Sequence, residues 1–387
     1  MAADMSQMLF ISWLYIYATF LTMLVFLPVL GAVIIVHELG HFLVARYFGV
    51  AVDKFSIGFG PEIWGRYDRY GTRWRVAWIP LGGYVMFKGD SNAASFPTEE
   101  SISQLSEEEK RGNYHAKPLA QRAAVSAAGP IANFLLAIVI FTFWFMFVGK
   151  AIIEPRVEKV VPNSAAAEAG LKPGDLITQI NGYKIRSFDD IQHMVMFGDG
   201  STLKVAVDRG GQTVEMKVAP RLVEIKDPDG NLMKIRQLGI MRPTDSKRTY
   251  QRFYPLGAFS ESLSETYRWL KQPVIVIRKL IASEISPEQI GGPVGIARMS
   301  YQIASVDVIN LFFWTAVISI QIGFMNLLPV PVLDGGHLLF YGVEAIRGRR
   351  MSERAMEISF RIGFTLVIML MLFATRNDLV HLFRKLG

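Results

Sequence analysis

The chain lacks cysteine entirely and is poor in charge. Without cysteine there are no disulfide bridges and no thiolate metal sites, so any transition metal has to be held by histidine and carboxylate side chains. Charged residues make up 19% of the 387 residues and hydrophobic ones 51%, a balance typical of membrane proteins. The net charge of +7 forms no basic stripe interleaved with aromatic residues, which argues against nucleic acid as a partner.

Long apolar segments are the main feature that is present. They predict transmembrane helices at about 21–45, 124–148, 306–332 and 359–374. Residues 8–36 carry no charge, and this run is too long for a secretory signal peptide and lacks its basic start. Residues 5–20 form either an extension of the first helix or a separate interfacial helix. The lipid bilayer is therefore a partner, and the expected fold class is a polytopic α-helical membrane protein.

The basic residues are distributed unevenly around these segments. No lysine or arginine precedes the first helix, whereas the loop between the last two helices contains four arginines. By the positive-inside rule, this loop at 342–358 and the segment between the first two helices lie in the cytoplasm. Both termini and residues 151–300 then lie on the opposite side. The residues that set this orientation are Arg46, Lys54, Arg111, Lys117, Arg122, Arg347, Arg349, Arg350 and Arg354.

Two short segments between the first two helices have strand character. Residues 72–79 alternate arginine with apolar side chains, and a second strand pattern follows at 82–87, so we predict a membrane-associated β-hairpin. An edge strand at 72–79 could pair with an extended substrate through backbone hydrogen bonds. The alternative is a hairpin that only anchors the protein through its tryptophans. The candidate substrate-binding residues of this strand are Trp74, Arg75, Val76 and Ala77.

The segment 37–41 reads HELGH and is an HExxH motif. Residues four apart lie on one face of a helix, so His37 and His41 can bind one zinc ion while Glu38 acts as general base on the metal-bound water. The motif lies inside an apolar segment, where each ionisable group costs about 2.5–3.5 kcal/mol. Three such groups within five residues therefore predict a shared metal rather than two hydrogen-bonded histidines and a glutamate with structural roles.

A catalytic zinc site usually has a third protein ligand and one open position. Asp334 is the best candidate, because it is a carboxylate beside an apolar segment in which prolines and glycines break the helix. His337, three residues later, competes for this role, and an aspartate that only caps the next helix is the alternative. We favour a zinc site formed by His37, His41 and Asp334.

Together these motifs resemble the site-2 protease family of intramembrane zinc metalloproteases, and most closely its bacterial RseP (regulator of sigma-E protease) group. The similarity extends in the same order over nearly the whole chain. Besides HELGH at 37–41 and NLLPVPVLDGG at 326–336, the matching segments are FSIGFG at 55–60, IPLGGYV at 79–85, AAGPIANF at 127–134, GPVGIA at 292–297 and SER at 352–354.

The resemblance implies zinc at His37, His41 and Asp334, with Glu38 as general base. It also implies that Asn326 contacts the substrate, for which a cap at a helix end is the alternative. The family cleaves transmembrane segments of single-span proteins, so the resemblance implies regulated intramembrane proteolysis in a bacterial inner membrane. The substrate classes that it suggests are anti-sigma factors already trimmed outside the membrane and remnant signal peptides.

Residues 157–220 resemble a PDZ domain, whose core motif lies at 166–182 and whose helix at 188–197 flanks a peptide groove. Such a domain binds a peptide or chain end by strand addition, and the alternative is a cap that only blocks access. RseP-group members carry two tandem PDZ domains, whereas a single PDZ core is found here. The resulting division is a membrane region at 1–150, a β-barrel-like PDZ domain outside the cytoplasm at 151–222, a linker with an amphipathic surface segment (255–280) at 223–304, and a membrane region at 305–387.

The sequence thus predicts an intramembrane zinc endopeptidase. One alternative is a PDZ-containing membrane scaffold with a structural zinc. The other is a metal or proton transporter that uses the intramembrane histidine, glutamate and aspartate residues. A transporter of that kind is expected to contain internal repeats, and none is visible in the sequence.

Overall fold

The computed structural model describes residues 2–90, 102–196, 198, 200–226, 232–242, 249–283 and 285–384. The chain separates into two units. Unit 1, which is mainly helical, comprises residues 1–141, 262–271 and 290–380. Unit 2, which contains most of the strands, comprises residues 142–261, 272–289 and 381–387.

Apolar helices dominate unit 1. Three described helical stretches are long and apolar enough to cross a membrane: Thr19–Tyr47 within α1 (Ala2–Tyr47), α4 (Leu119–Phe147), and Glu353–Val380 within α11 (Glu353–Arg384). Helix α1 continues through Pro28, so residues 5–20 extend the first helix instead of forming a separate one. The shorter helices of this unit are α3 (Glu107–Gly112), α8 (Pro293–Val306), α9 (Asn310–Asn326) and α10 (Asp334–Arg347).

The third predicted span is shorter than expected. The apolar run predicts a helix at 306–332, but α9 ends at Asn326 and contains 17 residues. Its length is therefore about 26 Å, less than the roughly 30 Å of a bilayer core. Pro329 and Pro331 keep the helix from continuing, because proline supplies no N–H and disfavours helical backbone before it. The described residues thus contain three membrane-capable helices where the sequence predicts four.

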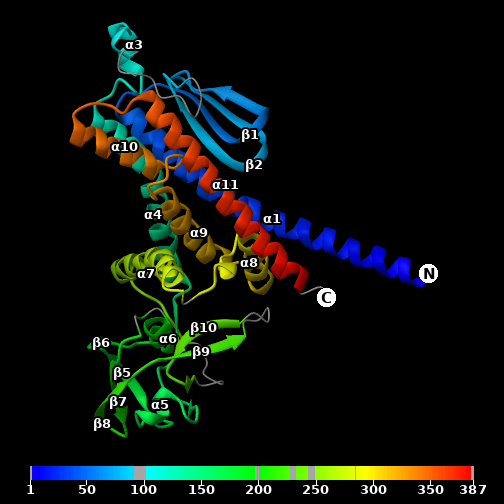
Figure 1. Cartoon of the computed structure of the whole chain (residues 1–387), viewed down its shortest axis with the longest axis vertical. Helices are drawn as coiled ribbons and strands as arrows, with labels where there is room; N and C mark the ends of the chain where they lie inside the picture. The colour runs from blue at the N-terminus through cyan, green and yellow to red at the C-terminus, as the bar shows by residue number, and fades with distance from the viewer. Residues whose placement is uncertain are drawn as a thin grey trace. The chain divides into compact units, whose positions relative to one another are not determined.

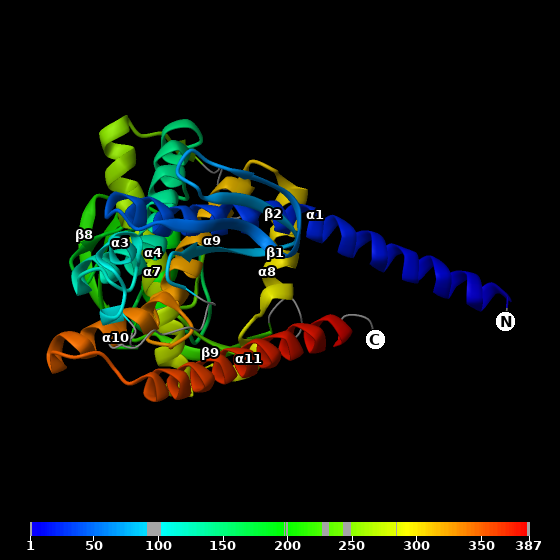
Figure 2. The same cartoon turned by 90° about the horizontal axis from the view of Figure 1, so that it is seen from above.

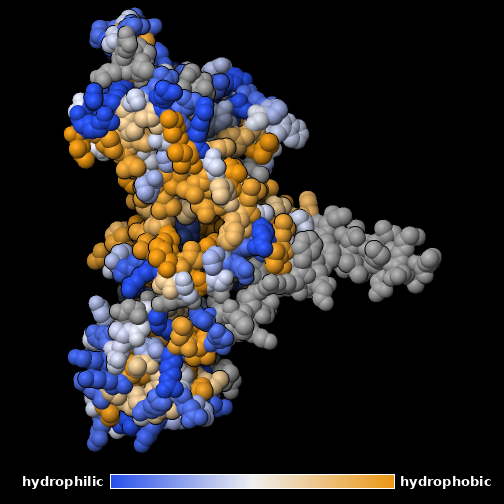
Figure 3. Space-filling model, in the orientation of Figure 1, coloured by the Kyte–Doolittle hydropathy of each residue, from blue (hydrophilic) through white to orange (hydrophobic). Residues whose placement is uncertain are grey.

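Small residues allow the helices of unit 1 to approach closely. A Cβ added to Gly40 of α1 would overlap the carbonyl of Ala128 and the side chain of Ala132, both on α4. A Cβ added to Gly323 of α9 would likewise lie 3.2 Å from the Cβ of Asn133 on α4. Helix α4 therefore lies beside both α1 and α9 (Figures 1 and 2). Hydrophobic residues cover much of the visible surface where α9 and α11 face the viewer, as expected of a face in contact with lipid (Figures 1 and 3).

The sheet formed by β1 (Val52–Tyr67) and β2 (Arg73–Phe87) packs against α1 (Figure 1). Both strands bend, so the sheet has four segments in the order 62–67, 73–77, 54–57 and 83–87. Phe55 pairs with both Trp74 and Val85, and Val76 pairs with both Ile57 and Trp64.

The antiparallel pairing predicted from the sequence is present, but the prediction that 72–79 is an edge strand is wrong. Segment 73–77 is hydrogen-bonded on both sides, so its backbone has no free edge for a substrate. The two edges of the sheet are 62–67 and 83–87. Glycines with positive φ at the bends, 91° at Gly58 and 87° at Gly60, make this folding-back possible.

Unit 2 contains a four-stranded antiparallel sheet in the order β6-β5-β7-β8 and three two-stranded ribbons, β9–β10, β4–β11 and β3–β12. These described sheets are small, and none closes into the barrel-like shape that the sequence predicts. The strands are β3 (Lys150–Ile152), β4 (Lys159–Val160), β5 (Leu176–Ile180), β6 (Tyr183–Lys184), β7 (Leu203–Arg209), β8 (Gln212–Val218), β9 (Arg221–Lys226), β10 (Leu232–Gln237), β11 (Ile240–Met241) and β12 (Thr249–Gln251). The helices are α5 (Ala165–Glu168), α6 (Phe188–Met196) and part of α7 (Pro255–Ile281).

An apolar core holds unit 2 together. Along β7, Leu203 and Val205 are buried while Lys204 between them is exposed, the alternation expected of a strand with one covered face. Helix α6 closely matches the helix predicted at 188–197. The core also contains Leu238, and β4 pairs with β11, so this folded unit continues past residue 222.

Candidate active site

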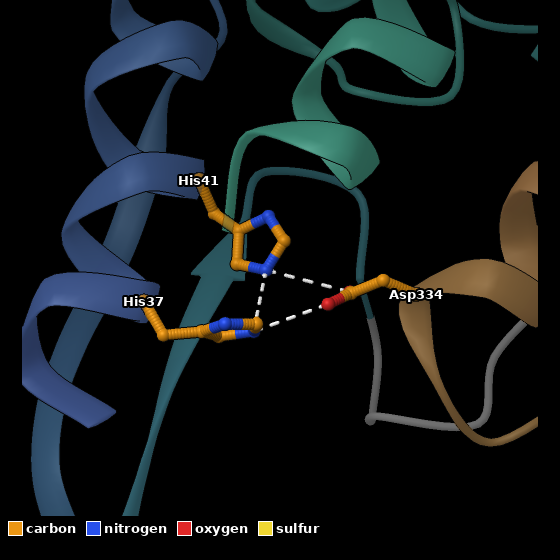
Figure 4. Close-up of side chains that lie close together, drawn as sticks. All are labelled: His37, His41 and Asp334. Atoms are coloured by element: carbon orange, nitrogen blue, oxygen red, sulfur yellow. Dashed lines mark hydrogen bonds and ion pairs between the residues drawn. The ribbon is translucent and has the colours of Figure 1, made fainter. Parts of the chain in front are cut away.

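Three side chains from two helices converge on one point (Figure 4). His37 and His41 lie one turn apart on α1, and their Nε2 atoms are 3.2 Å from each other. Asp334, the first residue of α10, lies with Oδ2 at 3.1 Å from His37 Nε2 and with Oδ1 at 3.4 Å from His41 Nε2. Both histidines are buried, so this group is shielded from bulk solvent.

The donor set fits a zinc ion. Its ligand atoms all lie within 4.8 Å of one another. Asp334 Oδ2 is buried and, among the described residues, accepts no hydrogen bond of good geometry, which leaves its lone pairs available to a cation. Two imidazoles and one carboxylate are a ligand set that catalytic zinc sites use, with a fourth position open to water. The predicted metal ligands are therefore brought together by the structure.

A tight turn brings Asp334 to the histidines. Residues 327–333 fold back on the start of α10, so a Cβ added to Gly335 would overlap the backbone of Leu327. A Cβ on Gly336 would likewise overlap the backbone of Val330 and Pro331. Glycines are thus required here because backbone lies against backbone. At the first position of α10, the Asp334 carboxylate is also favoured by the positive end of the helix dipole.

Glu38 lies between the two histidines in sequence and contacts the edge of the sheet. The backbone N–H of Val85 lies close to its carboxylate. A Cβ on Gly83 would lie 3.2 Å from Glu38 Cγ, so glycine lets this edge approach α1. The sheet edge at 83–87 therefore lies directly beside the metal group. The sequence indicated a strand at 82–87 but gave no sign that its backbone faces the site.

A cavity of about 370 Å³ contains these groups. His37, Glu38, His41 and Asp334 line it, together with Asn326 and His337. From the sheet, the described residues that line it are Tyr84, Val85 and Phe87 and not the segment 74–77. Asn326 thus lines the cavity that contains the metal group, whereas Trp74, Arg75, Val76 and Ala77 lie elsewhere in the sheet.

Other groups that line the cavity are polar and paired. Arg122 Nη2 lies 2.5 Å from Glu344 Oε1, and His115 Nε2 lies 2.7 Å from Asp90 Oδ1. Burial raises the pKa of the Tyr114 phenol well above its ordinary value, so this hydroxyl stays protonated. These groups provide hydrogen-bonding partners for water inside a helical unit whose outer surface is apolar.

Comparison with known proteins agrees with this geometry. Residues 25–370 match peptidase family M50. The chain belongs to this family. A Rhizobium meliloti protein named as a zinc metalloprotease is 42% identical over 359 residues, which cover 92% of this chain and 96% of that protein. The metalloprotease MmpA of Caulobacter vibrioides is 38% identical over 383 residues, which cover 93% of this chain and 96% of that protein.

Membership of family M50, the site-2 protease family, confirms several sequence predictions. The protein is a zinc metalloprotease, and its apolar helices are those of a polytopic membrane protein. His37, His41 and Asp334 form the group that can hold the metal. The individual roles of Glu38 and Asn326 stay predictions.

Proposed function

We propose that this M50 protease hydrolyses peptide bonds within transmembrane segments of single-span proteins in a bacterial inner membrane. The observation that carries the proposal is the position of the metal group. His37 and His41 lie inside the membrane-capable stretch Thr19–Tyr47, and the cavity around them is lined by polar groups. Water can therefore reach a site at membrane depth only through a space enclosed by protein.

The residues of the cavity supply complementary functions. His37, His41 and Asp334 would hold the zinc ion. When bound, the ion would polarise the scissile carbonyl and activate water. Glu38 takes the proton of the attacking water and delivers it to the leaving amine. Glu38 and Val85 line the same cavity, with the Val85 N–H beside the Glu38 carboxylate.

Substrate binding, in this proposal, uses the edge segment 83–87 rather than 74–77. A transmembrane helix satisfies its own backbone hydrogen bonds, so it has to be unwound and held extended before cleavage. Strand addition to the edge at Tyr84 and Val85 would do this beside the metal group and would accept varied side chains. Asn326 lines the same cavity and supplies a side-chain amide that can hydrogen-bond the extended backbone.

The proposal also covers the orientation of the protein in the membrane and the role of unit 2. The arginine-rich 342–358 loop and the β1–β2 sheet lie on the cytoplasmic side, following the positive-inside rule. Unit 2 contains a single PDZ domain on the periplasmic side, supported by its antiparallel sheet and helix α6. This domain binds a peptide or chain end of the substrate or limits its access. Substrates of suitable chemistry are anti-sigma factors trimmed outside the membrane and remnant signal peptides.

Cleavage by a Glu38→Gln variant tests the proposed function. A single-span substrate, co-reconstituted with the full-length protein in lipid vesicles, should be cut within its transmembrane segment by the wild type. The variant should bind zinc as the wild type does and lose nearly all cleavage, because the amide cannot take a proton. Near-normal turnover by the variant would falsify the general-base role, and cleavage confined to soluble segments would contradict the intramembrane assignment.

Replacing the PDZ region tests its role separately. Because Leu238 belongs to the core and β11 pairs with β4, the replacement by a flexible linker has to span residues 155–241. A gating role predicts that the variant also cuts untrimmed substrates. A recruiting role predicts that it cuts trimmed substrates more slowly. Unchanged cleavage of both substrates would exclude both roles.

A further inference from the structure

We propose that Asn133 is a positioning residue of the metal centre, whose side-chain carbonyl accepts a hydrogen bond from the Nδ1–H of His37. This hydrogen bond would fix the tautomer in which His37 Nε2 offers its lone pair to the metal. The inference rests on the proposed zinc site, and it adds a residue from α4 to a centre otherwise built by α1 and α10.

The carboxamide of Asn133 lies directly behind the His37 ring. Asn133 is fully buried, and its Nδ2 lies 3.3 Å from His37 Nδ1. Its Oδ1 has no hydrogen-bond partner among the described residues. Rotation of the carboxamide by 180° exchanges the two atoms without changing the shape of the side chain. In the exchanged orientation, Oδ1 lies within hydrogen-bond reach of His37 Nδ1.

Metal binding selects between these two orientations. A neutral imidazole carries one proton, and Nε2 can bind a metal only if that proton is on Nδ1. If the Asn133 NH₂ group donates to Nδ1, the proton has to be on Nε2, where it blocks the metal. If Asn133 Oδ1 accepts from Nδ1–H, Nε2 is free, 3.1 Å from Asp334 Oδ2. The metal-bound protein therefore requires the carbonyl to face His37.

The second histidine is oriented from the same helix by a different group. His41 Nδ1 donates a 2.8 Å hydrogen bond to the backbone carbonyl of Val125. Val125 and Asn133 are eight residues apart, which places both on one face of α4. Midway between them, a Cβ on Gly129 would overlap His41 Nε2 and lie 2.8 Å from His37 Cε1. This face of α4 thus gives each imidazole an acceptor and gives both the space that they need.

Packing between helices does not account for the Asn133 side chain. Ser319 of α9 donates its hydroxyl to the backbone carbonyl of Asn133, at 2.8 Å, so this contact would survive a change of side chain. Gly323 approaches the Cβ atom, which every residue but glycine has. The carboxamide group is the part that faces the metal site, and His37 is the residue that it contacts.

Zinc affinity of two variants tests the proposal in the full-length purified protein. Asn133→Leu keeps the approximate shape but removes the acceptor, and loss of such an outer partner typically weakens metal binding 10–100-fold. Asn133→Asp keeps an acceptor and removes the donor, so its zinc affinity should stay within about threefold of the wild type. Ile131→Ala, on the exposed face of α4, is the matched control and should bind zinc as the wild type does.

Cobalt provides a readout independent of cleavage. The d–d absorption of the cobalt-loaded protein reports ligand geometry, and it should change in Asn133→Leu but not in Asn133→Asp. Wild-type zinc affinity and an unchanged cobalt spectrum in Asn133→Leu would overturn the proposal. So would an Asn133→Asp variant that folds but binds zinc 10–100-fold more weakly, because the donor would then be the group that matters.

Two other outcomes of these experiments also bear on the proposal. If Asn133→Leu cannot be purified in folded form, Asn133→Asp decides the question alone. If Asp334→Ala binds zinc as tightly as the wild type, the metal site itself is wrong, and the proposed function fails independently of Asn133.

Discussion

Burial selects opposite kinds of residue in the two units. On α4 in unit 1, Ile131 and Leu135 are 50% and 56% exposed, whereas Asn133 between them is fully buried. On β7 in unit 2, the arrangement is reversed: Val205 and Val207 are buried and Lys204 is exposed. This part of α4 thus turns apolar side chains outward and encloses a polar one, whereas β7 encloses apolar ones.

The difference follows from the solvent that each unit meets. Lipid is as apolar as leucine, so exposing apolar side chains to it costs little free energy. Enclosed positions can therefore be occupied by the polar side chains that bind metal and substrate. In water the apolar side chains are the ones removed, and their burial stabilises the fold. We therefore expect substitutions of buried polar residues in unit 1 to change metal binding and cleavage. Those in the core of unit 2 should change stability.

The largest effect is expected from the metal ligands of unit 1. Asp334→Ala removes the only carboxylate of the described metal group and should lower the zinc content to near background. His337→Ala, in the same cavity but outside that group, should retain zinc. Metal analysis of the two purified variants checks this. The reverse pattern would assign the third ligand to His337.

A smaller but more selective effect is expected at the edge of the sheet. Val85→Pro removes a backbone N–H of the edge segment beside Glu38, so cleavage of a helical single-span substrate should fall steeply while zinc is retained. Val76→Pro lies in a segment paired on both sides, so it should destabilise the sheet itself.

Two assays separate these outcomes. The zinc content and thermal unfolding of each variant report the fold, and cleavage of a short flexible peptide reports the metal chemistry. Val85→Pro should cut the peptide better than the helical substrate, relative to the wild type. If Val76→Pro and Val85→Pro impair cleavage and stability equally, the distinction between the interior segment and the edge is wrong.

The smallest effect on cleavage is expected from Asp175 of unit 2. Burial alone would raise the pKa of this carboxyl, but hydrogen bonds from the Arg209 side chain and the Lys172 N–H outweigh it and lower the pKa. A lowered pKa in the folded state contributes stability above the unfolded value of about 3.9, and this contribution is lost as the pH falls through the folded value.

Asp175→Asn should therefore destabilise unit 2 at neutral pH by about 1.5–3 kcal/mol, the range for hydrogen bonds to charged groups. It should also flatten the acid limb of the stability curve below about pH 4. Hydrogen exchange of β5 and β7 peptides measures both effects. Zinc content at pH 7 should be unchanged, and a loss of zinc in this variant would contradict the separation of the two units.

The sequence predicted the metal group because its determinants are local. His37 and His41 are one turn apart, and Asp334 follows a break that prolines and glycines make visible. The helix at 188–197 and the amphipathic segment at 255–280 were likewise predicted from local patterns. The length of the third apolar helix was overestimated. Its apolar run continues to residue 332, but the helix ends at Asn326, because Pro329 disfavours helical backbone before it.

Features that depend on distant contacts could not be predicted. Phe55 pairs with both Trp74 and Val85 because both strands bend back on themselves. This bending decides which segment becomes the edge of the sheet, and no local sequence pattern predicts it. The AAGPIANF segment was noted for its resemblance, but α4 is apolar on most sides. Its sequence periodicity therefore does not reveal that Gly129 and Asn133 face the histidines.

X-ray absorption at the zinc edge of the full-length protein tests the central assignment most directly. The ligands His37, His41 and Asp334 predict nitrogen and oxygen neighbours at about 2.0–2.2 Å, with outer-shell scattering from two imidazoles. Loss of bound zinc in the Asp334→Ala variant should accompany this result. A spectrum that requires three imidazoles, or one whose ligand shell is unchanged by Asp334→Ala, would contradict the zinc site described for this protease.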